Sequence, residues 1–76
     1  MPHIIRFYEK AGDSLIGEHR LKDVPLTALQ KIFGLPSNDQ MYLCYDINDR
    51  QASCFQKITK IDFKLEQFDY FLEYDS

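Results

Sequence analysis

The closing segment IDFKLEQFDYFLEYDS (residues 61–76) alternates apolar and polar side chains, but the alternation changes parity within it. Apolar residues occupy odd positions from 61 to 65 and even positions from 68 to 74. Successive side chains of a strand point to opposite faces, so one regular strand cannot carry both patterns. The sequence therefore predicts a turn or bulge near Glu66 and Gln67, with a closing strand after it.

This closing strand is predicted to have two unlike faces. Its even positions, from Phe68 to Tyr74, are aromatic or aliphatic and suit a core. Its odd positions carry acids and one large apolar residue, namely Asp69, Phe71, Glu73 and Asp75. Phe71 therefore distinguishes two interpretations. If Phe71 lies exposed among the acids, the strand offers a binding surface; if a helix or neighbouring strand covers it, the strand is mainly scaffold.

A β-hairpin is predicted at the N-terminus. Residues 3–9 and 15–21 are rich in β-branched and aromatic side chains, and the short Gly-containing connection KAGDS separates them. Neither face of the first strand is purely apolar, because Arg6 shares one face with Ile4 and Tyr8. Such a strand fits a sheet edge, or a sheet that is partly covered on both sides.

The first helix is predicted within KDVPLTALQKIFGLP (residues 22–36), where apolar residues recur at helical spacing. Asp23 is a candidate N-cap, and Pro25 suits the first turn. Gly34 followed by Pro36 should end the helix.

A third strand and a second helix are predicted after this point. MYLCYDI (residues 41–47) has the composition of a strand. Asn48 then stands three residues before Gln51, which is the spacing of a capping box. An apolar stripe follows, so the second helix should run from about Asp49 to Ile58.

The elements follow one another in the order β-β-α-β-α-β within a single domain, residues 1–76. We expect the α+β class, with an antiparallel or mixed sheet and two helices packed on one of its faces. In that arrangement each element buries its apolar side. A chain of 76 residues buries only about 60 % of its unfolded surface, so its stability margin should be small.

Catalytic and metal-binding signatures are weak. His3 and His19 both fall in the predicted hairpin, but two histidines without a third ligand make a poor metal site. Cys44 and Cys54 are expected to be reduced, structural thiols, because no C-x-x-C motif accompanies them and the nearby Asp46 opposes a thiolate. The sequence therefore predicts no enzyme activity, no metal ion and no cofactor.

The charge of the chain is unevenly distributed. Residues 1–38 carry five Lys and Arg against four Asp and Glu, whereas residues 39–76 carry four against eight. This acidic second half disfavours nucleic acid as a direct partner and favours a basic protein. The apolar runs are far too short to cross a bilayer and no signal peptide is recognisable, so we expect a cytoplasmic protein without membrane contact.

Three segments carry a resemblance: LQKIFGLP (29–36), MYLCYDI (41–47) and FDYFLEY (68–74). They resemble a family of small bacterial proteins of unknown function, in which a helix ending in Phe-Gly precedes a Tyr-containing strand, a second helix and a closing Asp-Tyr-Phe-Leu-Glu strand. The likeness covers the chain from about Ile4 to Tyr74.

In size, charge and expected location the chain is also loosely similar to the immunity proteins of bacterial toxin systems, such as those paired with contact-dependent growth inhibition toxins. Such proteins bind a cognate toxin domain, often a basic nuclease, and block its active site or substrate surface. That similarity implies no particular binding residue in this chain.

Our hypothesis from the sequence is a non-enzymatic binding protein, most concretely an immunity protein that occludes a cognate basic toxin domain. Its carboxylates would pair with Lys and Arg of the toxin while Tyr rings fill shallow pockets. The alternative is a structural or regulatory homo-oligomer whose last strand pairs with its copy; a small enzyme or ligand-binding subunit is a third reading. The predicted partner-binding residues are Asp46, Asp49, Asp62, Glu66, Asp69, Tyr70, Glu73 and Tyr74.

Overall fold

The structure is a computed structural model that describes residues 3–75 of the chain. Its strands and helices follow the predicted order, β-β-α-β-α-β, which confirms the α+β class. The elements are β1 (His3–Glu9), β2 (Leu15–Arg20), α1 (Leu26–Phe33), β3 (Tyr45–Asp46), α2 (Asp49–Thr59) and β4 (Phe68–Tyr74).

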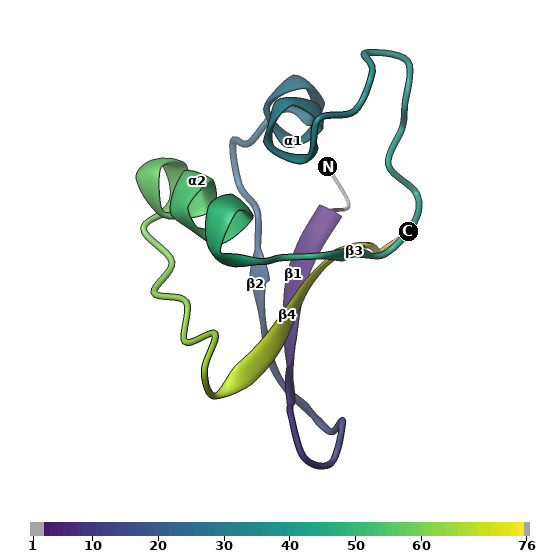
Figure 1. Ribbon diagram of the computed structural model, residues 1–76. Helices are drawn as coiled ribbons and strands as arrows, with labels where there is room; N and C mark the ends of the chain where they lie inside the picture. The colour runs from purple at the N-terminus through teal and green to yellow at the C-terminus, as the bar shows by residue number, and fades with distance from the viewer. Residues whose placement is uncertain (1–2, 76) are drawn as a thin grey trace.

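The four strands form one antiparallel sheet in the order β2-β1-β4-β3. β1 pairs with β4 along its whole length, from His3 opposite Tyr74 to Glu9 opposite Phe68. Both helices lie on one side of this sheet (Figure 1). The other side carries no helix, and we call it the open face. It is formed by Ile4, Arg6, Tyr8, Glu18, Arg20, Asp46, Asp69, Phe71 and Glu73.

The core lies between the sheet and the helices. Ile5 and Leu72 from the sheet pack in one cluster with Leu29 of α1 and Phe55 of α2, all of them fully buried. Burial alternates along β4 as the sequence predicts, since Tyr70 and Leu72 face the core while Phe71 is only half-buried. The predicted break before this strand is also confirmed, because residues 65–67 form a turn.

Local sequence signals determine the limits of α2 and the end of α1. The Asn48 side chain accepts hydrogen bonds from the N–H groups of Arg50 and Gln51, and the Gln51 side chain accepts one from the Asn48 N–H, which completes the predicted capping box. Gly34 ends α1 in the left-handed conformation, at φ 67°, where glycine meets no steric penalty.

The prediction that Asp23 caps α1 is wrong. The helix starts only at Leu26, Pro25 is the N-cap residue, and no side chain bonds to the first helical N–H groups. Asp23 lies too early in the chain and adopts a left-handed φ of 60°. Proline at this point fixes the backbone entry into the helix without a capping side chain.

The third strand is much shorter than the predicted 41–47. Met41 has a left-handed φ of 58°, its N–H donates to Asp39 Oδ1 at 2.8 Å, and its carbonyl oxygen lies 2.7 Å from His3 Nε2. Side chains therefore satisfy the backbone groups that a strand would offer to its neighbour. As a result Met41 is buried, whereas Tyr42 and Leu43 are both exposed.

Two side chains lie elsewhere than the sequence suggested. Cys44 was expected inside an apolar strand, but it is exposed because β3 begins only after it. His3 was expected to be partly exposed, yet it is buried through its contact with Met41. His19 lies opposite Ile5 and stacks on Phe7 with ring centres 5.4 Å apart.

Candidate functional site

Arg6 organises the charges at the centre of the open face. Its guanidinium lies 2.8 Å from Glu73 Oε1, 3.1 Å from Glu18 Oε1 and 3.3 Å from Asp75 Oδ1. The antiparallel pairing explains this, because Arg6 stands between Glu18 of β2 and Phe71 of β4, next to Glu73. The hydrogen bond to Glu73, together with the other two carboxylates, raises the pKa of Arg6.

Glu73 is held on both of its oxygens. Arg6 binds Oε1, and the Tyr8 hydroxyl donates to Oε2 at 2.8 Å. Burial raises the pKa of Tyr8, and the hydrogen bond to Glu73 raises it further. A carboxylate with two internal partners is part of the scaffold of the open face, so Glu73 positions its neighbours rather than reaching out to a partner.

Two other predicted carboxylates form exposed ion pairs. Lys10 Nζ lies 2.8 Å from Asp69 Oδ1, and Lys64 Nζ lies 3.3 Å from Asp62 Oδ2. Exposed pairs of this kind contribute about 0–1 kcal/mol. Asp69 can therefore exchange Lys10 for a cation from a partner at little cost, whereas Asp62 does not line the hollow that Asp69 shares with other predicted acids.

Three of the predicted acids come together around a hollow of about 440 Å³ between β3, the start of α2 and the start of β4. The hydrogen bond from the Ile47 N–H to the Tyr70 carbonyl oxygen, at 3.0 Å, ties this junction to β4. Among the described residues, no cation lies within ion-pair distance of Asp46 or Asp49. We call this feature the acidic hollow and define it by Asp46, Asp49, Leu65, Phe68, Asp69 and Phe71. Lys10 also lines it and is the cation that pairs with Asp69.

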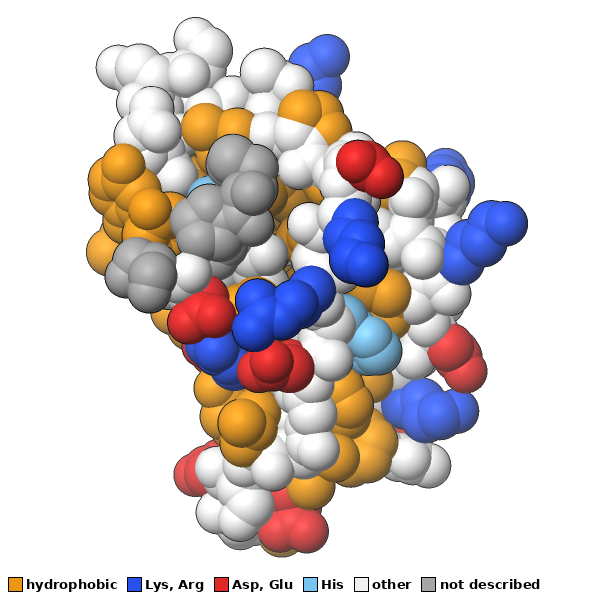
Figure 2. All heavy atoms as spheres, turned by 180° about the vertical axis from the view of Figure 1, so that it is seen from behind, with side chains coloured by type: hydrophobic (Ala, Val, Ile, Leu, Met, Phe, Trp, Pro, Cys, Tyr) orange, Lys and Arg blue, Asp and Glu red, His pale blue; other side chains and the backbone are white. Residues whose placement is uncertain are grey.

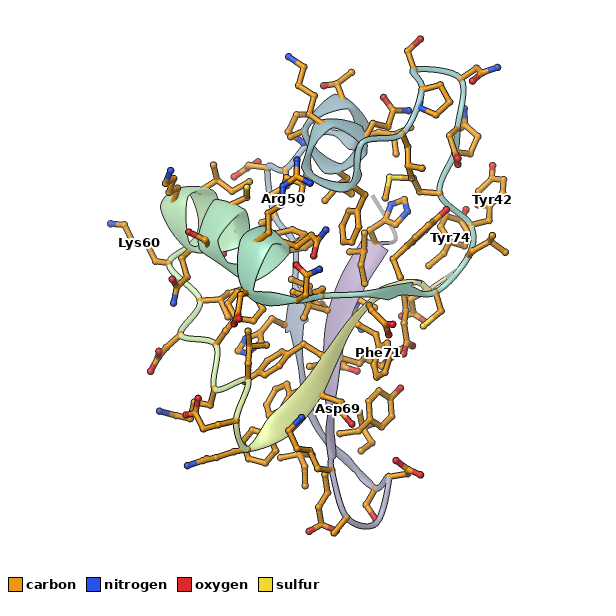
Figure 3. The ribbon with its side chains drawn as sticks, viewed as in Figure 1. Tyr42, Arg50, Lys60, Asp69, Phe71 and Tyr74 are labelled. Atoms are coloured by element: carbon orange, nitrogen blue, oxygen red, sulfur yellow. The ribbon has the colours of Figure 1, made fainter. Side chains whose placement is uncertain are left out.

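Phe71 lies at the rim of the acidic hollow. Figure 3 shows Asp69 and Phe71 on the side of β4 that faces away from the helices. Phe71 is half-buried and packs edge-to-face on Tyr8, with ring centres 5.6 Å apart. A second hollow of about 260 Å³, on the open face, is also lined by Asp69 and Phe71, together with Tyr8 and Cys44. Phe71 therefore lies between the two conditions set from the sequence, because it stands among the acids but Tyr8 of the neighbouring strand partly covers it.

Of the remaining predicted residues, Tyr70 also lines this hollow, whereas Asp62, Glu66, Glu73 and Tyr74 do not. Tyr70 is only 4 % exposed, and its hydroxyl oxygen accepts the Lys64 N–H at 3.1 Å, so we assign it to the core and not to an exposed face. Tyr74 packs edge-to-face on Tyr42, with ring centres 4.6 Å apart. Figure 3 shows the two side chains next to each other. Glu66 shares a separate hollow of about 190 Å³ with Asp49.

Sequence reasoning missed Arg6 and Tyr8 as parts of this surface. Both stand in the first strand, which the charge gradient of the chain gave no reason to examine. The signal that could have found them is the mixed composition of one face of that strand, where Arg6 and Tyr8 alternate with core residues. Such a face suits a strand that pairs with an acidic neighbour on a sheet covered on one side only.

The cysteines and the side chains that commonly bind metals lie scattered in the described part of the chain. Both cysteines are free, and partial burial, with Glu73 and Asp46 nearby, raises the pKa of Cys44, which disfavours a reactive thiolate. Within residues 3–75, no group of three or more His, Cys, Asp or Glu side chains is arranged to hold a metal ion. Neither helix of the described chain is long and apolar enough to span a membrane.

The sequence places the chain in a known family. It belongs to the family described as "Domain of unknown function (DUF7683)", whose model matches residues 3–73. The expected membership of a small uncharacterised family is therefore confirmed. A search of curated proteins finds no significant match to the chain. Neither comparison names an activity, so a functional assignment depends on the surface described above.

Proposed function

We propose that this member of the DUF7683 family is a protein-binding domain that covers a basic surface of its partner with the acidic hollow. One observation carries the proposal. Asp46, Asp49 and Asp69 come from three different elements and converge on one hollow, with the accessible ring of Phe71 at its rim.

The acidic hollow suits a Lys or Arg side chain of the partner. Such a side chain has an apolar stem and a charged head, and the hollow offers Leu65 and Phe68 for the stem and carboxylates for the head. Among residues 3–75, no cation lies within ion-pair distance of Asp46 or Asp49, so both carboxylates can accept one from a partner. The exposed Lys10–Asp69 pair can open, because its contribution to stability is small.

The aromatic rings next to the hollow would supply apolar contact. Phe71 and Tyr8 pack together on the open face, and aromatic residues of this kind dominate the binding energy of many interfaces. Glu73 and Arg6 hold these rings in place through the hydrogen bond to Tyr8. The surface is therefore organised before the partner arrives, which lowers the entropic cost of binding.

The most specific form of the proposal is an immunity protein in the cytoplasm of its producer cell. Its partner would be a toxin domain whose Lys and Arg side chains bind phosphate, and covering those side chains would block the toxin. The small size, the acidic second half of the chain and the acidic hollow support this form.

The test uses the product of the adjacent gene as the partner. Co-expression should protect the cell from it, and calorimetry should show binding that weakens as salt concentration rises. The double variant Asp46→Lys, Asp49→Lys should lose at least about tenfold in affinity, since two attractive contacts become repulsive. Asp62→Lys is the matched control, because Asp62 is exposed outside the hollow. Equal affinity of the double variant and the native protein would contradict the proposal.

A further inference from the structure

β2 forms one edge of the sheet, and its outer side is free. In the order β2-β1-β4-β3 only β1 pairs with β2. Within the described part of the chain, no backbone hydrogen bond outside this pairing involves residues 15–20. The strand contains neither proline nor lysine, the residues that commonly block such an edge. The sheet therefore offers a strand-length row of unused backbone groups.

The hydrogen-bond pattern shows which groups point outwards. The Glu9 N–H donates to the Ser14 carbonyl oxygen at 2.8 Å, and the Glu9 carbonyl accepts from the Asp13 N–H at 2.9 Å, so the backbone of Glu9 faces β2. Alternation along β1 makes Ile5 face β2 as well, opposite His19. The neighbours of His19, which are Glu18 and Arg20, consequently direct their N–H and C=O groups away from β1.

Exposed apolar side chains accompany this free edge. Leu15 is 53 % exposed and Ile16 is 47 % exposed, both in β2, and Ile58 of α2 is 51 % exposed. A hollow of about 410 Å³ lies between β2 and the C-terminal end of α2. It is lined by His19, Leu21, Ile58 and Ile61 among others. Large apolar side chains show that this edge is not protected against the addition of another strand. In the register proposed below, residues 18–20 of the two copies pair, and Leu15 and Ile16 lie outside that paired segment.

We propose that the occupant of this edge is β2 of a second copy of the chain, added antiparallel around a two-fold axis at His19. Among axes at residues 18, 19 and 20, the charges of the strand favour this register. An axis at Glu18 would place Glu18 opposite itself, and an axis at Arg20 would place Arg20 opposite itself. An axis at His19 places Glu18 of each copy opposite Arg20 of the other, so that two unlike pairs form.

The same register also gives hydrogen-bond partners to the outward N–H and C=O groups of β2. Glu18 and Arg20 become hydrogen-bonded pairs across the interface, because their N–H and C=O groups already point outwards. Arg20 is available for a new partner, since its side chain is 68 % exposed and lies 3.8 Å or more from its carboxylate neighbours. The view from behind in Figure 2 shows acidic and basic side chains lying next to one another, with a histidine beside them and hydrophobic side chains nearby.

The dimer is independent of the proposed function and compatible with it. The acidic hollow lies beside β3 and β4, towards the opposite edge of the sheet from β2. Each copy would keep its hollow free, so the dimer would present two of them. The dimer also differs from a pairing through the last strand, because β4 lies inside the sheet between β1 and β3.

The first test is a register-specific cross-link. In the proposed dimer the two His19 residues form a pair without hydrogen bonds, with Cα atoms about 4.5 Å apart, a separation that a disulfide can span. We would introduce His19→Cys after replacing both native cysteines (Cys44→Ser, Cys54→Ala). Mild oxidation should then give a covalent dimer in much higher yield than with Leu15→Cys or Arg20→Cys, which the same register keeps apart.

The second test needs no cysteine. Sedimentation equilibrium of the native protein should show a monomer–dimer equilibrium. Arg20→Glu should weaken association by about tenfold or more, because it places carboxylates opposite each other twice. Arg20→Pro should abolish association while leaving the fold intact, since proline is tolerated where the N–H of an edge strand faces solvent. Circular dichroism checks the fold of each variant.

Any of three results would overturn the inference. One is a native protein that stays monomeric at every accessible concentration. Another is a cross-link at position 19 that forms no better than at 15 or 20, which would mean that the copies associate elsewhere or in another register. A dimer that survives Arg20→Pro unchanged leads to the same conclusion, because strand addition at this edge requires the outward N–H.

Discussion

The Tyr8 hydroxyl donates a hydrogen bond of 2.8 Å to Glu73 Oε2, which joins two residues at opposite ends of the chain across the central strand pair of the sheet. Arg6 binds the other oxygen of the same carboxylate. This contact organises the open face, and it explains why the most acidic segment of the chain does not present all of its charges to solvent.

Removing that hydroxyl should destabilise the protein. Tyr8→Phe keeps the ring on Phe71 but deprives Glu73 of one donor, and a hydrogen bond to a charged group contributes about 1.5–3 kcal/mol. Because Glu73 is partly solvated, we expect a loss near the lower end of this range, measured by urea unfolding. Tyr42→Phe is the matched control, since Tyr42 is exposed and its hydroxyl has no hydrogen-bond partner among the described residues. Equal losses in both variants would contradict the role of the contact.

Stability should fall at alkaline pH. The folded protein raises the pKa of Tyr8, chiefly through burial, and that of Tyr45 for the same main reason. Above the ordinary tyrosine pKa of 10.0 the unfolded chain loses these protons while the folded chain still keeps them. The free energy of unfolding should therefore be constant with respect to these groups below pH 10.0 and decline above it. Urea titrations on either side of that pH should show a shallower decline for Tyr8→Phe; an unchanged slope would refute the assignment to Tyr8.

The capping box of α2 should be detectable by a single substitution. Asn48→Ala removes the acceptor of the Arg50 and Gln51 N–H groups, and loss of such a cap costs about 1 kcal/mol. Thermal unfolding measures the effect. Asn38→Ala, in an exposed turn, is the control and should leave the melting temperature unchanged. A normal melting temperature for Asn48→Ala would show that tertiary packing alone maintains the start of α2.

Two phenylalanines should separate stability from binding. Phe55→Ala empties the centre of the core and should cost about 3–5 kcal/mol, because Phe55 is fully buried. Phe71→Ala should cost much less stability, since Phe71 is half-buried, yet it should lower affinity for the protein partner by about tenfold or more. Chemical unfolding and calorimetry measure the two effects. A Phe71→Ala protein that binds normally would remove this ring from the interface.

Much of the fold could be predicted because its signals are local. The parity of apolar residues located the turn before β4 and assigned the two faces of that strand. Asn48 and Gln51, three residues apart, located the start of α2, and Gly34 located the end of α1. Such signals depend on neighbours within one or two turns of chain, so they can be identified without knowing the fold.

The prediction of the third strand failed because a residue far away in the sequence contacts the backbone of Met41. Met41 was assigned to a strand by composition, but its carbonyl oxygen contacts His3, which is thirty-eight positions earlier in the chain. That contact buries His3, shortens β3 and exposes Cys44. Composition contains no information about such a contact, because it arises only when the first strand has been brought against the middle of the chain.

The same distinction applies to the candidate site. By itself the sequence determined the element order, the acidic odd positions of β4 and the value of Phe71 as a diagnostic residue. Only the tertiary structure decided that Arg6 and Tyr8 hold Glu73, and that Asp46 and Asp49 join Asp69 around one hollow. The physical reason is that periodicity and capping act between near neighbours, whereas the partners of a charge are chosen by strand pairing between residues far apart in the chain.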